Sequence, residues 1–398
     1  MSRAWFVPTL APLVAAALAL AGAAAADPLD LHVRGLLDLA ATHDDAFVAR
    51  YDQFTAGETS FDPYRVRLFL DAQVTPTLAL HAQGRFGEDF AVNTSIVGAY
   101  AVWTPWSGRD AHLMAGKIPW IIGTWADRAY SNRNPLIGTP LMYQFPTTLA
   151  WDQMPFSTAE LLAARGSGAT GVNYGGGQGM PGMPVVWEDD WDFGVAVTGC
   201  ARPLEYAIGA GNGSPGWPQP GYDHTPGRSV LGRIGLAPTP ALRVGVSGAW
   251  GTYLEDWNAA ALPDGETLSE YHESLVMGDA SYEQGHVELR SEGFWKAWDT
   301  AYVGRLQVRG GYGELRVGLP AGTYVAARGE ALRFGRIADG AGGTQPWDDD
   351  VDRWEAGLGW RVTHGAILKL DGQRNVVHAP GVPDANHDLV ALGASVAF

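Results

Sequence analysis

The chain has 398 residues, 52 glycines, 16 tryptophans, a single cysteine and a formal net charge of −16. An acidic chain without a basic stripe argues against nucleic-acid binding, and one cysteine (Cys200) excludes an intramolecular disulfide framework and a cysteine-based zinc site. Abundant glycine and aromatic residues, with only 27 lysines and arginines, favour an all-β chain.

The first 26 residues have the features of a secretory signal peptide. Arg3 precedes a stretch rich in Ala, Leu and Val, and three alanines at positions 24–26 form a small-residue cleavage site. The apolar stretch is short for a membrane anchor. We therefore expect a mature chain of residues 27–398, in which the loss of Arg3 moves the net charge from −16 to −17.

The mature chain alternates apolar and polar residues in runs of about ten, the length that crosses a bilayer as a tilted strand. In residues 64–74, for example, the even positions are apolar or small, and the odd positions include Arg65, Arg67 and Asp71. Sixteen such runs are predicted: 29–39, 64–74, 78–86, 96–103, 111–117, 191–200, 204–211, 230–237, 242–253, 274–282, 287–298, 305–319, 324–337, 354–362, 367–377 and 385–398.

The connections between these runs alternate between very short turns and longer loops. If the N-terminus starts in the periplasm, every tight turn falls on that side and every long loop falls outside, as in outer-membrane barrels. Trp354 and Trp360 fall near opposite ends of one run and on the same face, as expected for two aromatic girdles. Paired glycines between Arg305 and Ile337 predict a β-bulge.

The last run keeps its period of two up to the terminal Phe398. A barrel needs such a closing strand, because its last strand must pair with its first to leave no edge in lipid. We predict an all-β fold: a closed antiparallel transmembrane β-barrel of about 16 strands over residues 27–398. A soluble β-sandwich is the alternative, but it needs no asymmetry between short turns and long loops.

Several motifs suggest enzymatic or metal chemistry but lack the required context. Residues 177–182 match the G-x-G-x-x-G spacing without a strand before and a helix after them, and residues 245–249 approach a nucleophile elbow in mid-strand. The carboxylate clusters at 187–192 and 348–352 lack the glycine and closing glutamate of an EF-hand loop. We predict no enzyme, no catalytic residues, no cofactor and no metal site, and interpret the clusters as a solvated outer rim.

The whole mature chain resembles the Gram-negative outer-membrane porin family in its leader, sixteen runs, terminal Phe398 and long third outer loop, residues 118–190. The resemblance implies that this loop folds into the lumen and narrows it. Residues 134–144 also resemble loop sequence of the phosphate-selective porin group. That group has a lysine- and arginine-rich third loop, whereas this loop has three arginines against six carboxylates, which puts a phosphate preference in doubt.

The predicted constriction lies where the long loop meets the first three strands. Alternation places Arg34, Arg65, Arg67 and Arg85 on the polar face, with Arg34 at mid-strand. Fields are screened within about 8 Å at physiological salt, so these local charges outweigh the net charge. The predicted pore-lining set is completed by loop carboxylates that would face the arginines, namely Asp127, Asp152 and Glu160. The alternative is that the arginines pair with lumen carboxylates and hold the strands in register.

The sequence therefore predicts a porin of the cell outer membrane, a passive diffusion channel for small hydrophilic solutes or ions. An anchored enzyme or binding protein, and a channel specific for a sugar or an anion, remain alternatives. The resemblance implies outer-membrane lipid, lipopolysaccharide, the barrel assembly machinery and small hydrophilic solutes as partners, and a homotrimer as an assembly state. No nucleic-acid partner is expected.

Overall fold

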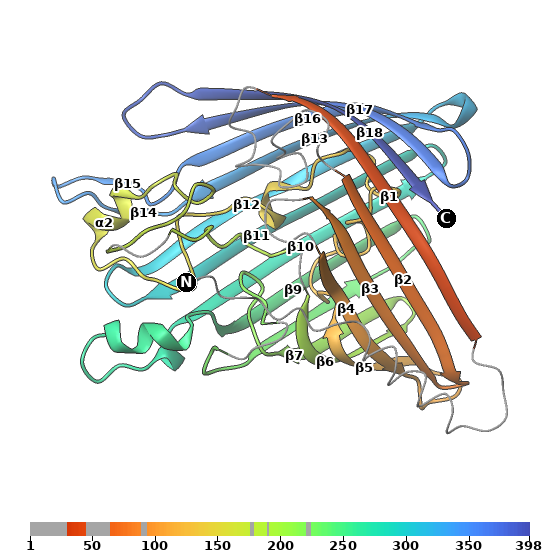
Figure 1. Ribbon diagram of the computed structural model, residues 1–398, viewed down its shortest axis with the longest axis horizontal. Coiled ribbons are helices and arrows are strands. Elements are labelled where there is room, and N and C mark those ends of the chain that lie inside the picture. Colours follow the sequence, from red (N-terminus) through yellow and green to blue (C-terminus); the bar gives the residue numbers. More distant parts are fainter. Residues whose placement is uncertain (1–29, 45–63, 89–93, 176–178, 189–190, 220–223) are drawn as a thin grey trace.

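The computed structural model describes residues 30–44, 64–88, 94–175, 179–188, 191–219 and 224–398. Sixteen antiparallel strands close into one barrel, in which each strand pairs with the next barrel strand and β1 pairs with β18 (Figure 1). The predicted fold is confirmed. The barrel strands are β1 (Asp30–Asp44), β2 (Tyr64–Thr75), β3 (Leu78–Glu88), β4 (Thr94–Trp103), β5 (Asp110–Ile118), β6 (Asp192–Ala201), β7 (Leu204–Gly211), β8 (Ser229–Leu236), β9 (Leu242–Thr252), β10 (His272–Gln284), β11 (Val287–Thr300), β12 (Gly304–Gly318), β13 (Thr323–Phe334), β16 (Asp350–Arg361), β17 (Ala366–His378) and β18 (Ala385–Ala397).

The barrel is polar inside and apolar outside. In β2 the charged Arg67 is 3% exposed, whereas its neighbour Leu68 is 39% exposed. Valines, leucines and aromatic residues continue this exposed belt on the other strands, among them Trp354 and Trp360. This inversion of the burial seen in soluble proteins is expected of a barrel whose outer face meets lipid. It favours the membrane barrel over the soluble sandwich.

The seam between β1 and β18 is closed by the last residue. The backbone N–H of Gly35 donates to Phe398 O at 2.7 Å, and the N–H of Phe398 donates to Gly35 O at 3.0 Å. A Cβ on Gly35 would lie 2.3 Å from the Phe398 ring, so only glycine leaves room for the aromatic side chain. The pairing of the terminal strand with the first strand is the closure that the sequence predicts.

Two local predictions were wrong. The run 324–337 ends at Phe334, and β14 (Arg336–Ala338) pairs instead with β15 (Thr344–Pro346) in a separate two-stranded sheet. Gly310 and Gly311 form no bulge, because the register with both neighbouring strands is continuous. A Cβ at either glycine would approach a neighbouring carbonyl oxygen to 2.1–2.2 Å, so these glycines permit close strand approach.

The two ends of the barrel differ, although less strictly than predicted. One end carries only short turns and is called the short-turn end here. The other is called the long-loop end, but it also holds the brief connection 301–303 between β11 and β12. Its loops contain the helices η2 (Leu141–Tyr143), α2 (Thr158–Ala163), η3 (Asp256–Ala261) and η4 (Leu268–Glu270), while η5 (Pro320–Gly322) lies in a short turn. No described helix is long and apolar enough to cross a membrane.

Candidate functional site

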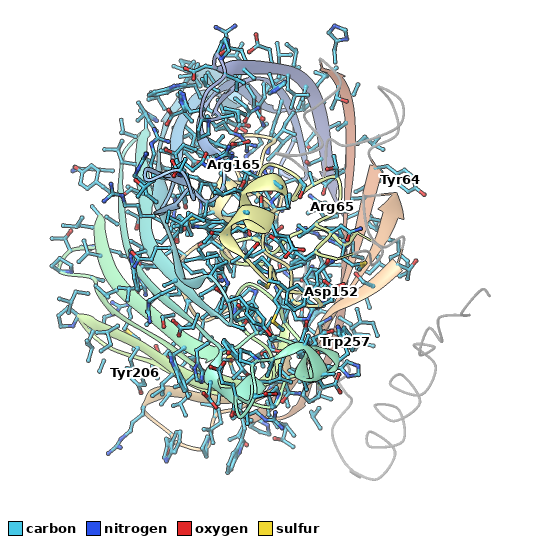
Figure 2. All side chains as sticks on the ribbon, turned by 90° about the vertical axis from the view of Figure 1, so that its left-hand side faces the viewer. Tyr64, Arg65, Asp152, Arg165, Tyr206 and Trp257 are labelled. Carbon is cyan, nitrogen blue, oxygen red and sulfur yellow. The ribbon has the colours of Figure 1, made fainter. Side chains whose placement is uncertain are left out.

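The connection between β5 and β6, residues 119–191, is called the long loop here, and it contacts inward-facing side chains around the barrel. Its hydrogen bonds reach β3, where Tyr130 Oη donates to Gln83 Oε1 at 2.9 Å, and β9, where Gly123 N donates to Ser247 Oγ at 2.9 Å. Figure 2, which looks into the long-loop end, shows Asp152 and Arg165 of this loop within the ring of strands. The wall meets the loop with two different surfaces.

The first surface, called the packed sector here, consists of the inner faces of β8–β13, β16 and β17. There the loop and the wall share one apolar cluster, while none of the described residues of β1–β3 belongs to it. Loop side chains such as Trp125 and Tyr143 stack on each other at 5.8 Å, and Trp125 packs edge-on against Tyr312 of β12. The wall contributes Leu231, Ala249, Leu275, Met277, Phe294, Trp298, Leu306, Val308, Tyr312, Leu332, Phe334, Val351 and Val377.

Within the packed sector, six buried charged residues of β13, β16 and β17 form a charged cradle: Arg328, Glu330, Arg353, Glu355, Lys369 and Asp371. The cradle binds backbone groups of residues 131–141, which overlap the stretch singled out in the sequence. The acids accept backbone N–H groups: Leu141 N donates to Glu330 at 2.5 Å, Gly138 N to Glu355 at 2.9 Å and Ile137 N to Asp371. The cations donate to backbone carbonyls: Arg353 donates to Thr139 O at 2.9 Å. Lys369 Nζ donates to Ser131 O at 2.6 Å, Asn134 O at 2.6 Å and Leu136 O at 3.0 Å.

The second surface, called the polar sector here, is the inner face of β1–β3. Arg67 donates to Ala129 O at 3.0 Å, and its guanidinium lies 5.1 Å from the ring centre of Tyr130. A cavity of about 20 Å³ remains between wall and loop, lined by Arg67, Gln83, Tyr130 and Glu188 and by apolar loop residues. This is about the space of one water molecule. The loop thus meets the polar sector through polar groups and a small gap.

The predicted arginines fall into two sets. Arg65, Arg67 and Arg85 are 9%, 3% and 5% exposed on the inner face, with Arg67 and Arg85 directly opposite each other on β2 and β3. Arg34 is exposed at the seam, where β18 ends opposite Gly35, and it bonds Asp71 at 2.5 Å. Alternation along one strand placed Arg34 at mid-strand, but it could not show where the partner strand stops.

The three predicted loop acids lie in different surroundings. Asp127 is exposed, and its carbonyl accepts a hydrogen bond from Arg133. Asp152 O accepts from Trp257 Nε1 of η3 at 3.0 Å. Glu160 lies in the first turn of α2, where its carboxylate accepts from Phe156 N at 2.7 Å.

The acids that approach the arginine wall are others. Asp38 of β1 accepts from Arg65 at 3.4 Å, and Glu188 lines the same cavity as Arg67. The alternation of β1 predicts that Asp38 faces inward, and the sequence shows that Glu188 is an acid of the long loop. Neither observation predicts which arginine each acid approaches. Tyr130 and Gln83 carry no charge that would have singled them out.

Three carboxylates at the long-loop end are held away from water. Burial is the main cause that raises the pKa of both Asp152 and Glu255 above the usual values. Burial also raises the pKa of Asp348 to about 6, although its carboxylate accepts the N–H groups of Thr148 and Gly166 at 2.6 and 3.1 Å. The described residues hold no group of three His, Cys, Asp or Glu that could bind a metal ion. Asp189 and Asp190 of the predicted rim clusters lie outside the described residues.

No family model and no curated protein matches this sequence. The solved structures do match. A loop-deletion mutant of OmpT, an outer membrane protein of Vibrio cholerae, aligns with a TM-score of 0.56 at 12% identity, covering 94% of this chain and all of that one. The anion-selective porin of Comamonas acidovorans gives 0.55 at 10% identity, covering 93% and 100%. The outer membrane channel DcaP of Acinetobacter baumannii gives 0.55 at 9% identity, covering 93% and 97%.

The chain has the general porin fold. The similar structures are of outer-membrane proteins, and the exposed apolar belt of this barrel agrees with that location. With identities this low, the likeness concerns the fold, and what the lumen does must be argued from its residues.

Proposed function

We propose that this porin-fold barrel is a channel in the cell outer membrane that passes small hydrophilic solutes or ions between the long loop and the polar sector. The observation that carries the proposal is the asymmetry of the loop contacts. In the packed sector, apolar side chains leave no place for a hydrated solute. In the polar sector, a guanidinium, an amide, a phenol and a carboxylate share the lining of a gap with apolar side chains. Polar groups can exchange a contact with each other for a contact with water or an ion.

Arg67 and Glu188 line this gap, and the wall beside it carries two further arginines, from which we infer a preference for anions. Arg65, Arg67 and Arg85 are buried on the wall, and the acids that approach them are Asp38 and Glu188. Among the described residues beside the gap, guanidiniums therefore outnumber carboxylates, in a place with little water to screen them. The narrowness of the gap favours the ion- or substrate-specific channel over a wide general diffusion pore.

Selectivity measurements test the proposal directly. In planar bilayers with a salt gradient, Arg67→Gln should move the reversal potential toward cation preference, and Arg65→Ala with Arg67→Ala should move it further. Arg309→Gln is the matched control, because Arg309 faces outward on β12 and the charge change is the same. Equal reversal potentials for folded wild-type and Arg67→Gln proteins would refute the anion pathway, and the arginines would then serve to hold strands and loop in place.

An enzyme anchored in the membrane is the competing function. One group of side chains has the hydroxyl, imidazole and carboxylate that a catalytic triad uses. At the β4–β5 turn, Thr104 Oγ1 lies 2.8 Å from His112 Nδ1, and His112 Nε2 lies 2.8 Å from Asp110. We assign this chain of bonds to the turn, because Thr104 N is bonded to Thr77 O of the adjacent turn and none of these residues lines the cavity beside Arg67. Unchanged channel properties in His112→Ala would agree with that assignment.

A further inference from the structure

Two buried N–H donors without acceptors line the gap between the long loop and the polar sector. Nε of Arg67 and Nε1 of Trp125 are shielded from solvent, and neither has a hydrogen-bond partner among the described residues. Both residues line the gap, and they are 3% and 1% exposed. Buried N–H groups in proteins are nearly always bonded, because an unpaired one is costly. Two such donors beside one cavity therefore indicate a missing acceptor.

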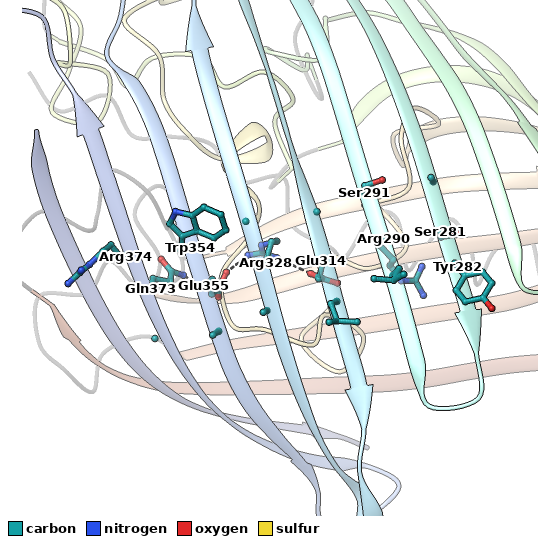
Figure 3. A pocket seen from close by; sticks show the side chains of 18 of the residues that line it. Ser281, Tyr282, Arg290, Ser291, Glu314, Arg328, Trp354, Glu355, Gln373 and Arg374 are labelled. Carbon is teal, nitrogen blue, oxygen red and sulfur yellow. Dashed lines mark hydrogen bonds and ion pairs between the residues drawn. The ribbon is translucent and has the colours of Figure 1, made fainter.

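Arg328 of β13 shows the usual partners of a buried guanidinium. Figure 3 shows its bonds to Glu314 and Glu355, two acids of the neighbouring strands. Arg67 instead uses Nη1 for a backbone acceptor, Ala129 O at 3.0 Å. The remaining edge of its guanidinium, formed by Nε and Nη2, carries two parallel donors of the kind that binds a carboxylate. The acceptor that Arg67 lacks can therefore be the carboxylate of a solute.

The rest of the lining decides which carboxylate fits the gap. Most of it is apolar or aromatic, for example Val97, Trp120, Ile122 and Trp191. A hydrated inorganic ion gains nothing from such a surface, whereas an alkyl or aryl group gains apolar contact. Glu188 lines the same gap. A second negative charge on the solute would meet this carboxylate where little water screens it, so the gap discriminates against dianions.

We propose that this gap is a binding site for small monocarboxylates with an apolar body, which place the carboxylate on Arg67 and the body against the apolar lining. The inference rests on the proposed channel and names the solute class that its lumen selects. The gap of about 20 Å³ holds about one water molecule. A carboxylate displaces this water and widens the gap on the side where Tyr130 is bonded to Gln83. Each carboxylate oxygen has two lone pairs, so one oxygen can accept from both Arg67 and Trp125.

Saturation-transfer NMR on the folded protein in detergent measures binding without transport. The probes are propionate, a monocarboxylate, and succinate, a dicarboxylate, at neutral pH and with sodium chloride present. Wild-type protein should bind propionate about fivefold more tightly than succinate. Arg67→Gln should weaken propionate binding about tenfold, because a charge-assisted bidentate contact is lost. Heat-modified migration in SDS checks that each variant is folded.

Two further variants separate the roles of the lining. Trp125→Phe removes the unpartnered N–H and keeps an aromatic ring, and it should weaken propionate binding about threefold. Trp298→Phe is the matched control, because Trp298 Nε1 is also buried without a partner among the described residues but does not line the gap. Glu188→Gln should bring succinate binding up to that of propionate. Asp127→Asn is its control, an exposed acid of the same loop outside the gap lining.

Equal propionate binding by folded wild-type and Arg67→Gln proteins overturns the site, and so do equal losses in Trp125→Phe and Trp298→Phe. Wild-type protein that binds succinate as tightly as propionate overturns the preference for monocarboxylates. Planar bilayers judge the channel separately. Chloride current that propionate blocks in wild type but not in Arg67→Gln supports both proposals. Propionate binding without current through the folded protein supports the site and refutes the channel, whereas current without propionate binding overturns the site alone.

Discussion

The packed sector and the polar sector hold the same loop by different means. In the packed sector, indole and phenyl rings interlock with the wall, and the cradle binds the loop backbone with charged side chains. In the polar sector, the described bonds join Arg67 to a carbonyl, Tyr130 to Gln83 and Ser131 to Asp38, beside a small gap. Dry apolar contact and buried charge are costly to undo, whereas polar contact beside water is not. We therefore expect the loop to stay fixed against the packed sector and to border the solute path at the polar sector.

The largest expected effect comes from emptying the packed sector. Trp298 of β11 is fully buried and packs edge-on against Trp347 at 6.0 Å. Trp298→Ala should lower the free energy of unfolding by about 3–5 kcal/mol, the usual result of removing a buried large side chain. Urea unfolding in detergent or lipid measures it. Trp354→Ala, on the membrane face and 66% exposed, is the control and should cost much less. Similar losses in both variants would mean that the sector is not a core.

The cradle gives the next effect. Lys369 Nζ donates to three loop carbonyls, so Lys369→Met leaves these three acceptors without their donor. We expect a loss of about 3 kcal/mol, at about 1 kcal/mol for each of the three hydrogen bonds removed, and a higher single-channel conductance as residues 131–136 leave the wall. Lys117→Met is the control, because Lys117 donates to Ile96 O of the wall. Conductance that stays at the wild-type value would show that the cradle does not position the loop.

The Asp348 carboxylate, which accepts the N–H groups of Thr148 and Gly166 in the long loop, is called the loop clamp here. The pH dependence of stability tests its protonation. Burial raises the pKa of this carboxyl from the usual 3.8 to about 6. The folded state therefore holds the proton more tightly than the unfolded chain does. Asp348 stabilises the fold most below about pH 4, and this contribution is lost as the pH rises from about 4 to 6. At about 1.4 kcal/mol per pKa unit, the loss is about 3 kcal/mol.

Asp348→Asn carries no such proton and should lose this part of the pH dependence. The measurement is the unfolding midpoint in urea at pH 4 and at pH 7, for the variant and the wild type. Asp264→Asn is the control, since Asp264 is exposed in the loop between β9 and β10. If Asp348→Asn and wild type lose the same stability between the two pH values, the carboxyl is ionised throughout and the clamp is not proton-sensitive.

The barrel could be predicted from the sequence, but the division of its lumen into a packed sector and a polar sector could not. Alternation on Tyr64 to Val74 shows which residues face inward, because each strand obeys the same local rule whatever its partners. The course of residues 119–191 follows no such rule. Trp125 and Tyr143 were invisible as a core because their partners, such as Tyr312, lie more than 150 residues away in sequence.

The charged residues show the same limit. Alternation places Arg65, Arg67 and Arg85 on one face, and the structure puts them on the buried inner wall. The acids opposite them were chosen by composition alone. The Glu160 carboxylate accepts from Phe156 N, and the described bond of Asp152 is made by its backbone carbonyl. The partner of a charged loop residue can be predicted only when the fold of the loop is known. An acid in the first turn of a helix, such as Glu160, and a pore-lining acid look alike in sequence.

The smallest effect should come from the polar sector, and it tests whether that side tolerates change. Tyr130→Phe removes one hydrogen bond, to Gln83 at 2.9 Å, and keeps the ring beside Arg67. The amide can bond water in the neighbouring gap, so we expect a loss of at most about 1 kcal/mol in stability. The conductance should change by less than twofold, since the ring still narrows the gap, while Tyr130→Ala should raise it further. A loss as large as that of Trp298→Ala would mean that the loop is sealed on this side too, and that solutes cross only when the whole loop moves.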